Sequence, residues 1–394
     1  MSIEERVFIA GAGPVGLVAA ANLLRHGVPV TVFEAGAALA EESRASTFHP
    51  PTLDMLGDVG AAGPLIAQGL IAPQVQYRTR DGVIATFDFA AIADATRHPF
   101  RLQAEQFKLT RILLERLGRN SGFRIEFGAR VAEVAQDGAA VHLTLERGGA
   151  TERRSARWLI GADGARSDVR RALGIEFSGF TWPERFLVVS TPFDFRAVIA
   201  QLVSVTYVAD PLRWHFLLEI PGGIWRVMFP LTETVSDEEA LSRAFADRLM
   251  AAVVPGIATY EIAHTTLYKV HQRVAKSFRA GRAFLAGDAA HLNNPLGGMG
   301  MNGGIHDAVN LTERLAAVFA GTAPAAELDR YQRQRRAITL DYIEKQSSEN
   351  KRNLECGNPE FAATLRRTAA DPQRTRDYLL RLAMIASLRR AAAL

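Results

Sequence analysis

The stretch "RVFIAGAGPVGLVAAANLLRHGVPVTVFEAG", residues 6–36, predicts a strand, a glycine-rich turn, a helix and a second strand. Val7–Ala10 and Val30–Phe33 are short apolar runs, and Leu17–Arg25 is rich in small and helix-forming residues. Gly27 follows at the position where a helix end favours a left-handed residue. This order is typical of the unit that opens a Rossmann-like α/β fold.

The turn between the first strand and the helix has three glycines at the spacing of a dinucleotide-binding loop. Gly11 permits the tight turn, Gly13 lets a pyrophosphate approach the backbone, and Gly16 lets helix and strand pack closely. The free N–H groups and the positive dipole end of the helix then face the phosphates. Glu34 ends the second strand, where a carboxylate receives ribose hydroxyls; the alternative is a packing turn without a ligand. The predicted dinucleotide-binding residues of this unit are Gly11, Gly13, Pro14, Val15, Gly16 and Glu34.

The composition limits the other classes of partner. The chain has 394 residues and a net charge of +4, and it has no basic run with interleaved aromatics, so no nucleic-acid partner is expected. The single cysteine, Cys356, excludes a disulfide or a cysteine-based metal site within the chain and fits a cytoplasmic location. The apolar stretch of residues 7–24 is interrupted by glycine and proline and lacks the flanks of a signal peptide, so no membrane span is expected.

Two later segments repeat the pattern of a strand that ends in a glycine-containing turn. In "ARWLIGADGARSDVRRALGI", residues 156–175, Trp158–Ile160 predicts a strand and Ser167 begins a helix. In "RAFLAGDAAH", Ala283–Ala286 predicts a buried strand that ends in Gly287-Asp288. The following "GMGMNGGIHDAVNL", residues 298–311, predicts a second glycine-rich loop that leads into a helix. Such bare backbone suggests that something approaches it closely.

These three markers together resemble the class A flavoprotein aromatic hydroxylases, the para-hydroxybenzoate hydroxylase-like FAD monooxygenases. The motifs are the GxGxxG of the first turn, Asp163-Gly164, and Gly287-Asp288 followed by Pro295. The resemblance implies an α/β fold with a Rossmann-like FAD-binding domain, an inserted mixed or antiparallel β-sheet substrate domain, and C-terminal helices. The implied division is residues 1–75, 98–175 and 276–325 for a discontinuous FAD domain, 76–97 and 176–275 for the substrate sheet, and 326–394 for the helical region.

The resemblance also implies roles for residues outside the first turn. Arg44 would support the AMP–ribose side of FAD, Gln103 would contact the flavin side, and the backbone of Val131 would contact adenine. Asp163 would tie the FAD domain together and take part in cofactor and NAD(P)H binding, and Asp288 would bond the ribityl chain. No histidine or cysteine is identified as an attachment point, so non-covalent FAD is expected. The backbone facing the pyrimidine end of the flavin would be that of Gly300, Met301 and Asn302.

Residues 177–269 predict strands, which in the family cover an aromatic ring bound over the flavin. The stretches 201–210, 213–220 and 224–231 are joined by turns into hairpin-like pairs, and a helix is expected at 236–253. Two further helices are expected at 328–352, with a dense cationic face that is solvated or a dimer surface, and at 375–394. The candidate pocket residues, each with a core or surface alternative, are Thr47, His49, Tyr207, His215, Trp225, Met228 and Pro295, and the candidate catalytic residues are Tyr207, His215 and Pro295.

The resemblance implies a monooxygenase that hydroxylates a small phenolic, aromatic acid or hydroxypyridine substrate with NAD(P)H and O2 through a flavin C4a-hydroperoxide. A phenol is a better nucleophile as its anion, so a base or relay is expected. His291 and His306 flank the flavin loop without ligand spacing, so no metal is expected. The alternatives are an FAD oxidoreductase that does not oxygenate and a flavin-binding protein without turnover; the WxWxIP signature of a halogenase is missing. A homodimer stays open.

The stretch "EAGAALAEESR", residues 34–44, bears on the electron donor. It holds Glu41 and Glu42 and no cation before Arg44, so a 2′-phosphate would meet negative charge there. The sequence therefore predicts that NADH is used at least as well as NADPH. A strong preference for NADPH would instead mean that the phosphate is read elsewhere, by Arg166, Arg170 or Arg273.

Overall fold

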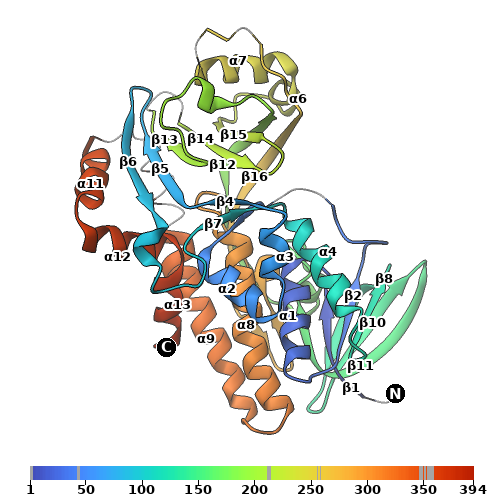
Figure 1. Ribbon diagram of the computed structural model, residues 1–394. Helices are drawn as coiled ribbons and strands as arrows, with labels where there is room; N and C mark the ends of the chain where they lie inside the picture. The colour runs from blue at the N-terminus through green and yellow to red at the C-terminus, as the bar shows by residue number, and fades with distance from the viewer. Residues whose placement is uncertain are drawn as a thin grey trace.

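The structure is a computed structural model whose elements form two stacked layers. Figure 1 shows the first sheet with α1, α8 and α9 in the lower layer, and the second sheet with α6 and α7 above it. The helices α11 and α12 lie beside β5 and β6, and α13 lies against α9. The described residues are 3–41, 45–210, 214–254, 256–257, 259–345, 349, 352 and 359–394.

The first sheet contains the predicted strand–helix–strand unit. β1 (Glu4–Ala10) leads through α1 (Pro14–Arg25) to β2 (Val30–Glu34), and β1 pairs in parallel with both β2 and β11 (Ala150–Gly161). The strand order is β17-β18-β11-β1-β2-β8, with β9 and β10 paired beside β11. The predicted Rossmann-like unit is confirmed. The other strands are β8 (Phe123–Phe127), β9 (Arg130–Gln136), β10 (Val141–Arg147), β17 (Arg279–Ala280) and β18 (Ala283–Leu285).

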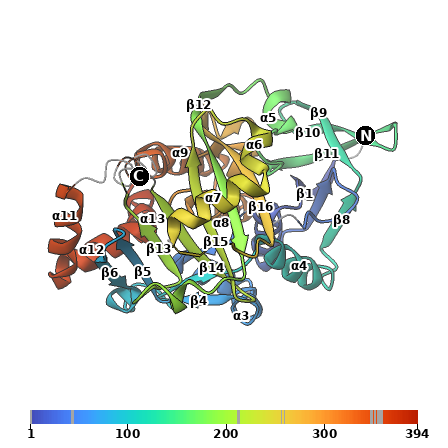
Figure 2. The ribbon, with the colours of Figure 1, turned by 90° about the horizontal axis from the view of Figure 1, so that it is seen from above.

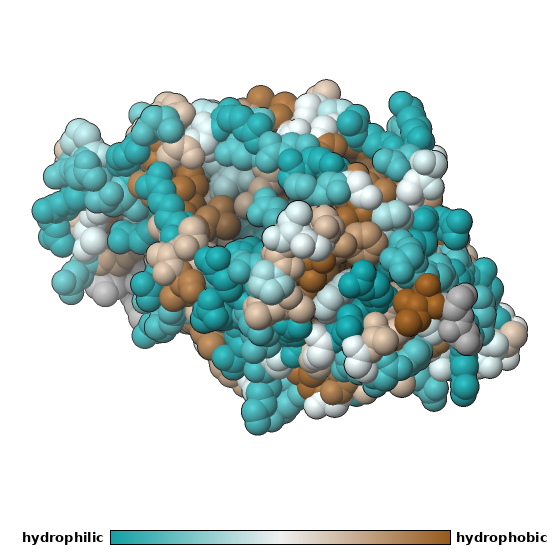
Figure 3. Space-filling view, turned by 90° about the horizontal axis from the view of Figure 1, so that it is seen from below, coloured by the Kyte–Doolittle hydropathy of each residue, from teal (hydrophilic) through white to brown (hydrophobic). Residues whose placement is uncertain are grey.

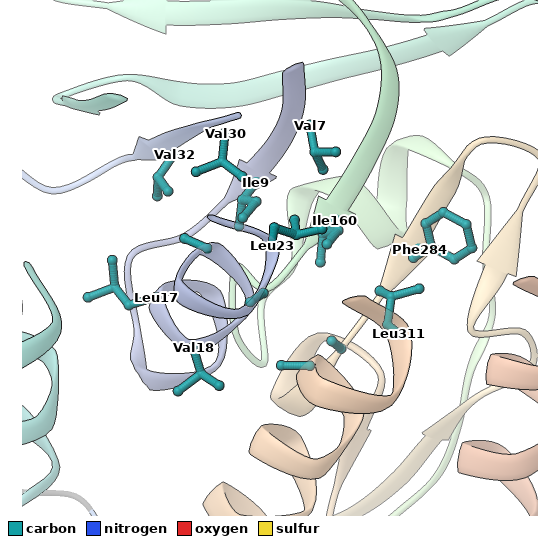
Figure 4. Close-up of a cluster of buried hydrophobic side chains, with 14 of the residues drawn as sticks. Val7, Ile9, Leu17, Val18, Leu23, Val30, Val32, Ile160, Phe284 and Leu311 are labelled. Atoms are coloured by element: carbon teal, nitrogen blue, oxygen red, sulfur yellow. The ribbon is translucent and has the colours of Figure 1, made fainter. Parts of the chain in front are cut away.

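The helix α1 packs against the first sheet beside α8 (Met299–Phe319), and its apolar side chains fill the space between helix and strands. Figure 4 shows Leu17 and Leu23 among the strand residues Ile9, Val30 and Val32. All five side chains are fully buried. Full burial of a side chain of this size stabilises the fold by about 1.5–3 kcal/mol. The packing therefore fixes the glycine-rich turn at the edge of the sheet where the parallel strands end.

The second sheet is largely antiparallel and has the strand order β19-β16-β12-β15-β14-β13-β5-β6. The predicted hairpin pairs are confirmed, because β14 pairs in antiparallel fashion with both β13 and β15. α6 (Asp237–Leu241) and α7 (Arg243–Val253) cover one face, as Figure 2 shows from above. The strands are β5 (Gln74–Arg78), β6 (Val83–Asp88), β12 (Phe177–Thr191), β13 (Val205–Val208), β14 (His215–Ile220), β15 (Ile224–Leu231), β16 (His264–Ala275) and β19 (His291–Leu292).

A small third sheet and several helices complete the described structure. The small sheet has the order β3-β7-β4 and lies below the second sheet. Its strands are β3 (Thr47–Phe48), β4 (Leu70–Ala72) and β7 (Arg101–Gln103). The remaining helices are α2 (Pro50–Asp58), α3 (Ala62–Ile66), α4 (Gln106–Leu117), α5 (Asp168–Ala172), α9 (Leu328–Ile338), η5 (Thr339–Glu344), α11 (Pro359–Ala369), α12 (Pro372–Leu382) and α13 (Ile385–Ala392), with short 3-10 turns at η1 (Phe89–Ile92), η2 (Phe195–Ala197), η3 (Gly287–Ala289) and η4 (Ala325–Glu327).

Three predicted helices and loops differ from the structure. The helix expected at 236–253 is two helices, because Ser242 has an extended backbone and its hydroxyl accepts a hydrogen bond from the Phe245 N–H. The helix expected at 375–394 is also divided, since Met384 has a φ of 65° and separates α12 from α13. Within 298–311, where a glycine-rich loop that leads into a helix is expected, the helix α8 already begins at Met299.

The cationic face expected on the helix at 328–352 is only partly solvated. Arg335 is buried and forms an ion pair with Asp307 of α8. Residues 346–348, 350–351 and Cys356 lie outside the described residues.

Hydrophilic side chains cover most of the molecular face in Figure 3, and hydrophobic side chains appear there in small groups. Within the described ranges, every helix is too short or too polar to cross a membrane. The large hydrophobic side chains that are exposed in the described part of the chain are Ile3, Ile71, Phe180, Val198 and Leu241.

Candidate active site

A cavity of about 1130 Å³ lies between the first and second sheets. The carboxyl ends of β1, β2 and β18 reach it from below, and the face of the second sheet opposite α7 covers it from above. Ligands of doubly wound folds bind at such strand ends. Most predicted site residues line it: Gly11, Gly13, Pro14, Val15, Glu34, Thr47, Val131, Asp163, Tyr207, Met228, Asp288, Pro295, Gly300 and Met301.

The three glycines of the first turn differ in what surrounds them. Gly11 has a φ of +98°, and a Cβ there would lie 2.5 Å from the carbonyl oxygen of Ala162. A Cβ on Gly16 would lie 2.0 Å from the carbonyl oxygen of Gly11. A Cβ on Gly13 would have no atom within 4 Å, so Gly13 leaves open space on the cavity side. Two glycines are therefore needed for backbone packing, and the middle one leaves room for a ligand.

Glu34 is held at the end of β2 by backbone groups. Its Oε2 accepts a hydrogen bond from the Ala12 N–H at 2.7 Å, and its Oε1 accepts one from the Gly36 N–H at 2.8 Å. Each carboxylate oxygen can accept a further hydrogen bond. The carboxylate is therefore oriented beside the turn with capacity for a hydroxyl donor. Arg44, predicted to act nearby, lies outside the described residues.

Asp163 is bonded within the turn after β11, and Arg170 connects that turn to a second segment of the cavity floor. Burial raises the pKa of Asp163, while Ser167 and the Val169 N–H act in the opposite direction. Arg170 donates to the carbonyl oxygens of Ala289 and Ala165, both at 2.9 Å. The turn after β11 is thereby tied to the turn after β18.

Asp288 is exposed at the end of β18, between a buried Gly287 and a buried Ala289, and lines the cavity. Gly287 has a φ of +61°, and a Cβ on it would lie 2.8 Å from Cγ2 of Val15. A Cβ on Gly304 would lie 2.7 Å from the same Val15 atom. The bare backbone of this stretch is therefore partly required by packing between α1 and α8, and not by a ligand alone.

A hydrogen-bond network behind the cavity wall holds the segment that precedes α8. The Asn302 amide donates to the carbonyl oxygens of Thr47 at 2.8 Å and Gly298 at 2.6 Å, and its Oδ1 accepts from the His49 N–H at 2.9 Å. The Thr47 hydroxyl donates to Gln103 at 2.8 Å. Asn302, His49 and Gln103 are buried and do not line the cavity themselves. They support the wall from behind.

His49 is neutral in this environment. Burial and the nearby Arg101 guanidinium hold the pKa of His49 well below its usual range. Its Nε2–H donates to the carbonyl oxygen of Gly297 at 2.8 Å. The imidazole thus fixes the glycine pair before α8.

Two predicted pocket residues point away from the cavity. Successive residues of a strand face opposite sides, so Trp225 and Met228 of β15 cannot share a face. Met228 lines the cavity, whereas the Trp225 ring packs 5.8 Å from Phe195 in the cluster beneath α7. His215 of β14 likewise packs on that side, 5.7 Å from the Phe229 ring. We therefore leave Trp225 and His215 out of the site that we propose.

Arg101 is a cavity residue that the sequence reasoning missed. It is 1% exposed, lies 5.7 Å from the centre of the Phe89 ring, and lines the cavity. Its Nε and Nη2 have no hydrogen-bond partner among the described residues, and no carboxylate there forms an ion pair with it. A buried charge without a partner is costly. The available signal was one arginine inside the apolar stretch "HPFRLQA".

A family model described as an FAD binding domain matches residues 4–346. The chain belongs to this family of FAD-dependent aromatic hydroxylases. The hydroxylase is 35% identical to para-nitrophenol 4-monooxygenase of Pseudomonas sp. strain WBC-3, over 89% of this chain and 87% of the relative. It is 32% identical to 6-hydroxy-3-succinoylpyridine 3-monooxygenase of Pseudomonas putida strain S16, over 96% and 98%.

A solved structure supports the same assignment. The hydroxylase superposes on p-nitrophenol 4-monooxygenase from Pseudomonas putida DLL-E4 with a TM-score of 0.90 and 31% identity, over 97% of this chain and 99% of that one. The predicted family, the PHBH-like fold and the flavin-dependent monooxygenase activity are confirmed. The residues of the hydroxylase fit FAD, because Gly13 leaves open space beside the α1 N-terminus and Asp288 is presented to the same cavity.

The described part of the hydroxylase has no group of three or more His, Cys, Asp or Glu side chains that could hold a metal ion. His291 forms a hydrogen bond with Asp307, and His306 forms one with Thr52.

Proposed function

We propose that the substrate is a phenol or hydroxypyridine bound as its anion, and that Arg101 holds the anionic oxygen. The observation that carries this proposal is Arg101, a buried residue of the cavity wall whose Nε and Nη2 have no hydrogen-bond partner in the described structure. A cation within about 4–6 Å of the oxygen favours the ionised form of a phenol. The pocket would thus select the form of the substrate that is the better nucleophile.

The walls around Arg101 suit an aromatic ring. Tyr207 lines the cavity and stacks on Tyr77, with ring centroids 5.2 Å apart. Behind this wall, the Tyr378 hydroxyl of α12 donates a hydrogen bond to that of Tyr77 at 2.9 Å. Several other lining side chains are apolar, and an apolar wall that excludes water would protect a reactive oxygen intermediate. They include Val188, Phe216, Leu218, Met228, Leu292 and Pro295.

We further propose that oxygen is added at a ring carbon that lies para to the hydroxyl and already carries a substituent. In the names of both relatives, the numbered position of oxygenation is para to the hydroxyl and is already substituted. A phenolate shares its negative charge with the para carbon, so this carbon attacks an electrophilic oxygen. With para-nitrophenol as the probe, release of nitrite in step with NADH oxidation supports this regiochemistry, and a catechol that keeps its nitro group contradicts it.

The predicted FAD contacts stand as proposals supported by this geometry. Gly13 and the α1 N-terminus would receive the pyrophosphate, and Glu34 the adenosine ribose. Val131 and Asp163 would lie along the adenosine half, and Asp288 beside the ribityl chain. Bound non-covalently, FAD would supply the electrons and the activated oxygen. The protein orients the ring, excludes water and holds the phenolate oxygen.

We also propose that NADH serves at least as well as NADPH. The prediction rests on Glu41 and Glu42, which follow β2. Arg111 contacts Glu41 and offsets part of its charge, which weakens the expected discrimination. The ratio of kcat/KM for the two donors under one set of conditions measures the preference. Three further expectations stay predictions from the sequence: the division into FAD and substrate domains, a cytoplasmic location and a possible homodimer.

The test of the Arg101 proposal compares Arg101→Gln and Arg101→Lys with the wild type. Binding of a phenol is followed through the flavin absorbance change at pH values below and above the phenol's pKa. Because a hydrogen bond to a charged group contributes about 1.5–3 kcal/mol, we expect Arg101→Gln to bind the phenolate about tenfold to a hundredfold more weakly. Arg101→Lys should recover part of this loss.

Arg97→Gln serves as the matched control. Arg97 is more than half exposed and pairs with Asp58 at the surface, so phenolate affinity should change little. Equal phenolate affinity in wild type and Arg101→Gln would overturn the proposed role of Arg101. The family and its flavin chemistry would stand in that case.

A further inference from the structure

Asp307 is a fully buried carboxylate on α8 that contacts neither cavity nor solvent. Its Oδ2 accepts a hydrogen bond from the Gly287 N–H at 3.1 Å and one from Nε2–H of His291 at 2.8 Å. Its Oδ1 accepts from Nε of Arg335 at 2.7 Å. One side chain therefore joins the turn after β18, the start of β19, α8 and α9.

The bond to Gly287 fixes the residue next to Asp288. Gly287 has left-handed backbone, with a φ of +61°, and its carbonyl oxygen accepts from the Ala290 N–H at 2.8 Å. Its N–H is directed to Asp307. Asp288 follows directly and is exposed to the cavity. The position of the Asp288 carboxylate thus depends on a backbone amide that Asp307 holds.

The bond to His291 reaches the second sheet. His291 is 1% exposed and begins β19, in which it is paired with Val274 of β16. β16 extends along the second sheet and contributes Tyr268 and Val270 to the cavity wall. The same carboxylate therefore connects the floor of the cavity to its roof.

Arg335 keeps Asp307 ionised and ties it to the start of α8. Burial alone would raise the pKa of Asp307, but Arg335 and His291 outweigh it and lower the pKa to about 2. Nη2 of Arg335 also donates to the carbonyl oxygen of Gly303, at 3.3 Å, in the first turns of α8. Those turns carry Gly300 and Met301, which line the cavity.

We propose that Asp307 is the positioning residue of the FAD site: it fixes the Asp288 turn and the first turns of α8 relative to each other and, through His291, sets the second sheet above them. Asp307 acts through these residues and touches neither flavin nor substrate. This role of Asp307 in FAD binding does not depend on the proposed role of Arg101.

The test compares Asp307→Asn with Thr312→Val. Asparagine keeps the shape of Asp307, but its amide nitrogen would face one of the three donors. Thr312 is also buried on α8, where its Oγ1 accepts a hydrogen bond from Asn22 of α1 at 2.7 Å. This bond does not involve the Asp288 turn. Both variants remove a buried polar contact of α8, and only Asp307→Asn removes one that holds the FAD site.

The dissociation constant of FAD from the apoprotein and the Tm of the apoprotein are measured for both variants. We expect Asp307→Asn to weaken FAD binding about tenfold to a hundredfold. Thr312→Val should lower the Tm of the apoprotein while FAD affinity stays within about twofold of wild type. FAD affinity that is unchanged in Asp307→Asn, or reduced equally in Thr312→Val, would overturn the proposal.

A second variant keeps the proposal testable if Asp307→Asn does not fold. His291→Leu removes one donor, and Gly287 and Arg335 still satisfy the carboxylate. We expect FAD affinity to change less than about threefold, because Asp288 is still held. The flavin absorbance change on addition of para-nitrophenol should be smaller, because the second sheet loses its link to Asp307 through His291. An absorbance change equal to that of wild type would contradict the link from Asp307 to the second sheet.

Discussion

Asp288 lies exposed between two buried neighbours at the end of β18, and this position can be tested directly. We expect Asp288→Ala to weaken FAD binding about tenfold to a hundredfold, because a hydrogen bond to a charged group contributes about 1.5–3 kcal/mol. Titration of the apoprotein with FAD measures the change. Asp329→Ala is the control, since Asp329 is 66% exposed and pairs with Arg279 away from the cavity. FAD affinity that is alike in the two variants would refute the assignment of Asp288.

At this scale the sequence predicted residues that belong to a motif and missed residues that do not. Gly11, Gly13 and Asp288 were predicted, because fixed spacing relates each to a strand end, and all three line the cavity. Arg101 was missed, because one arginine in an apolar stretch has no spacing to mark it. Trp225 and Met228 are both predicted for the pocket, but their odd separation within one strand places them on opposite faces.

The contact between α1 and α8 is the feature of element packing that is most sensitive to one added carbon. A Cβ on Gly304 would lie 2.7 Å from Cγ2 of Val15 and 2.9 Å from Cα of Gly287. Alanine is favoured over glycine within a helix by up to about 1 kcal/mol. Overpacking costs about 1–3 kcal/mol, and here part of the clash is with backbone that cannot rotate away. We expect Gly304→Ala to lower the free energy of unfolding, as measured by urea denaturation.

Gly57→Ala provides the comparison for that experiment. Gly57 lies in α2, and a Cβ there would have an ordinary contact, 3.7 Å from the Arg97 guanidinium. Helix propensity should therefore dominate, and the variant should be as stable as wild type or more so. A Gly304→Ala protein that gains stability like Gly57→Ala would show that α1 and α8 can separate without cost.

The boundaries of elements were harder to predict than their existence. The hydrophobic pattern at 236–253 continues through Ser242, so periodicity alone gave one helix where a capping serine makes two. The segment after Gly298 is rich in glycine, a poor helix former, so the expected loop extends past the actual start of the helix. In the structure, packing of Gly304 against α1 outweighs that propensity, and α8 begins at Met299.

On the scale of the whole molecule, the cavity depends on contacts between segments far apart in the chain. β5 pairs in parallel with β13, and β19 joins the second sheet directly after the Asp288 turn. The three motifs predicted the lower half of the site, because each motif is local. The upper half has no local motif, because its lining depends on strand register and on which face of the sheet α7 covers. The Asp307 network, which joins the halves, is visible only in the folded chain.

Acid should destabilise the whole apoprotein through buried histidines that stay neutral. Burial and Arg335 lower the pKa of His306 to about 3, from 6.5 in the unfolded chain. Between these values the unfolded state binds a proton that the folded state does not, so stability falls as pH decreases from about 6.5 towards 3. One such group contributes about 1.36 kcal/mol per pH unit, or about 2 kcal/mol between pH 6.5 and pH 5. Asp307 acts in a lower window, because its stabilising charge is lost only as pH falls below 3.8 towards about 2.

His306→Gln isolates this contribution, because glutamine can still bond the Thr52 hydroxyl that lies 2.9 Å from His306 Nε2. The free energy of unfolding of the apoprotein is measured by urea denaturation at pH 5, 6 and 7 for variant and wild type. Any change at pH 7 reflects packing and is subtracted. The loss of stability from pH 7 to pH 5 should then be smaller in the variant by about 2 kcal/mol. His49 is present in both proteins, and its lowered pKa makes the stability of both fall as the pH decreases. Parallel curves for the two proteins would mean that His306 becomes protonated in the folded state, which requires α8 to open beside Asp307.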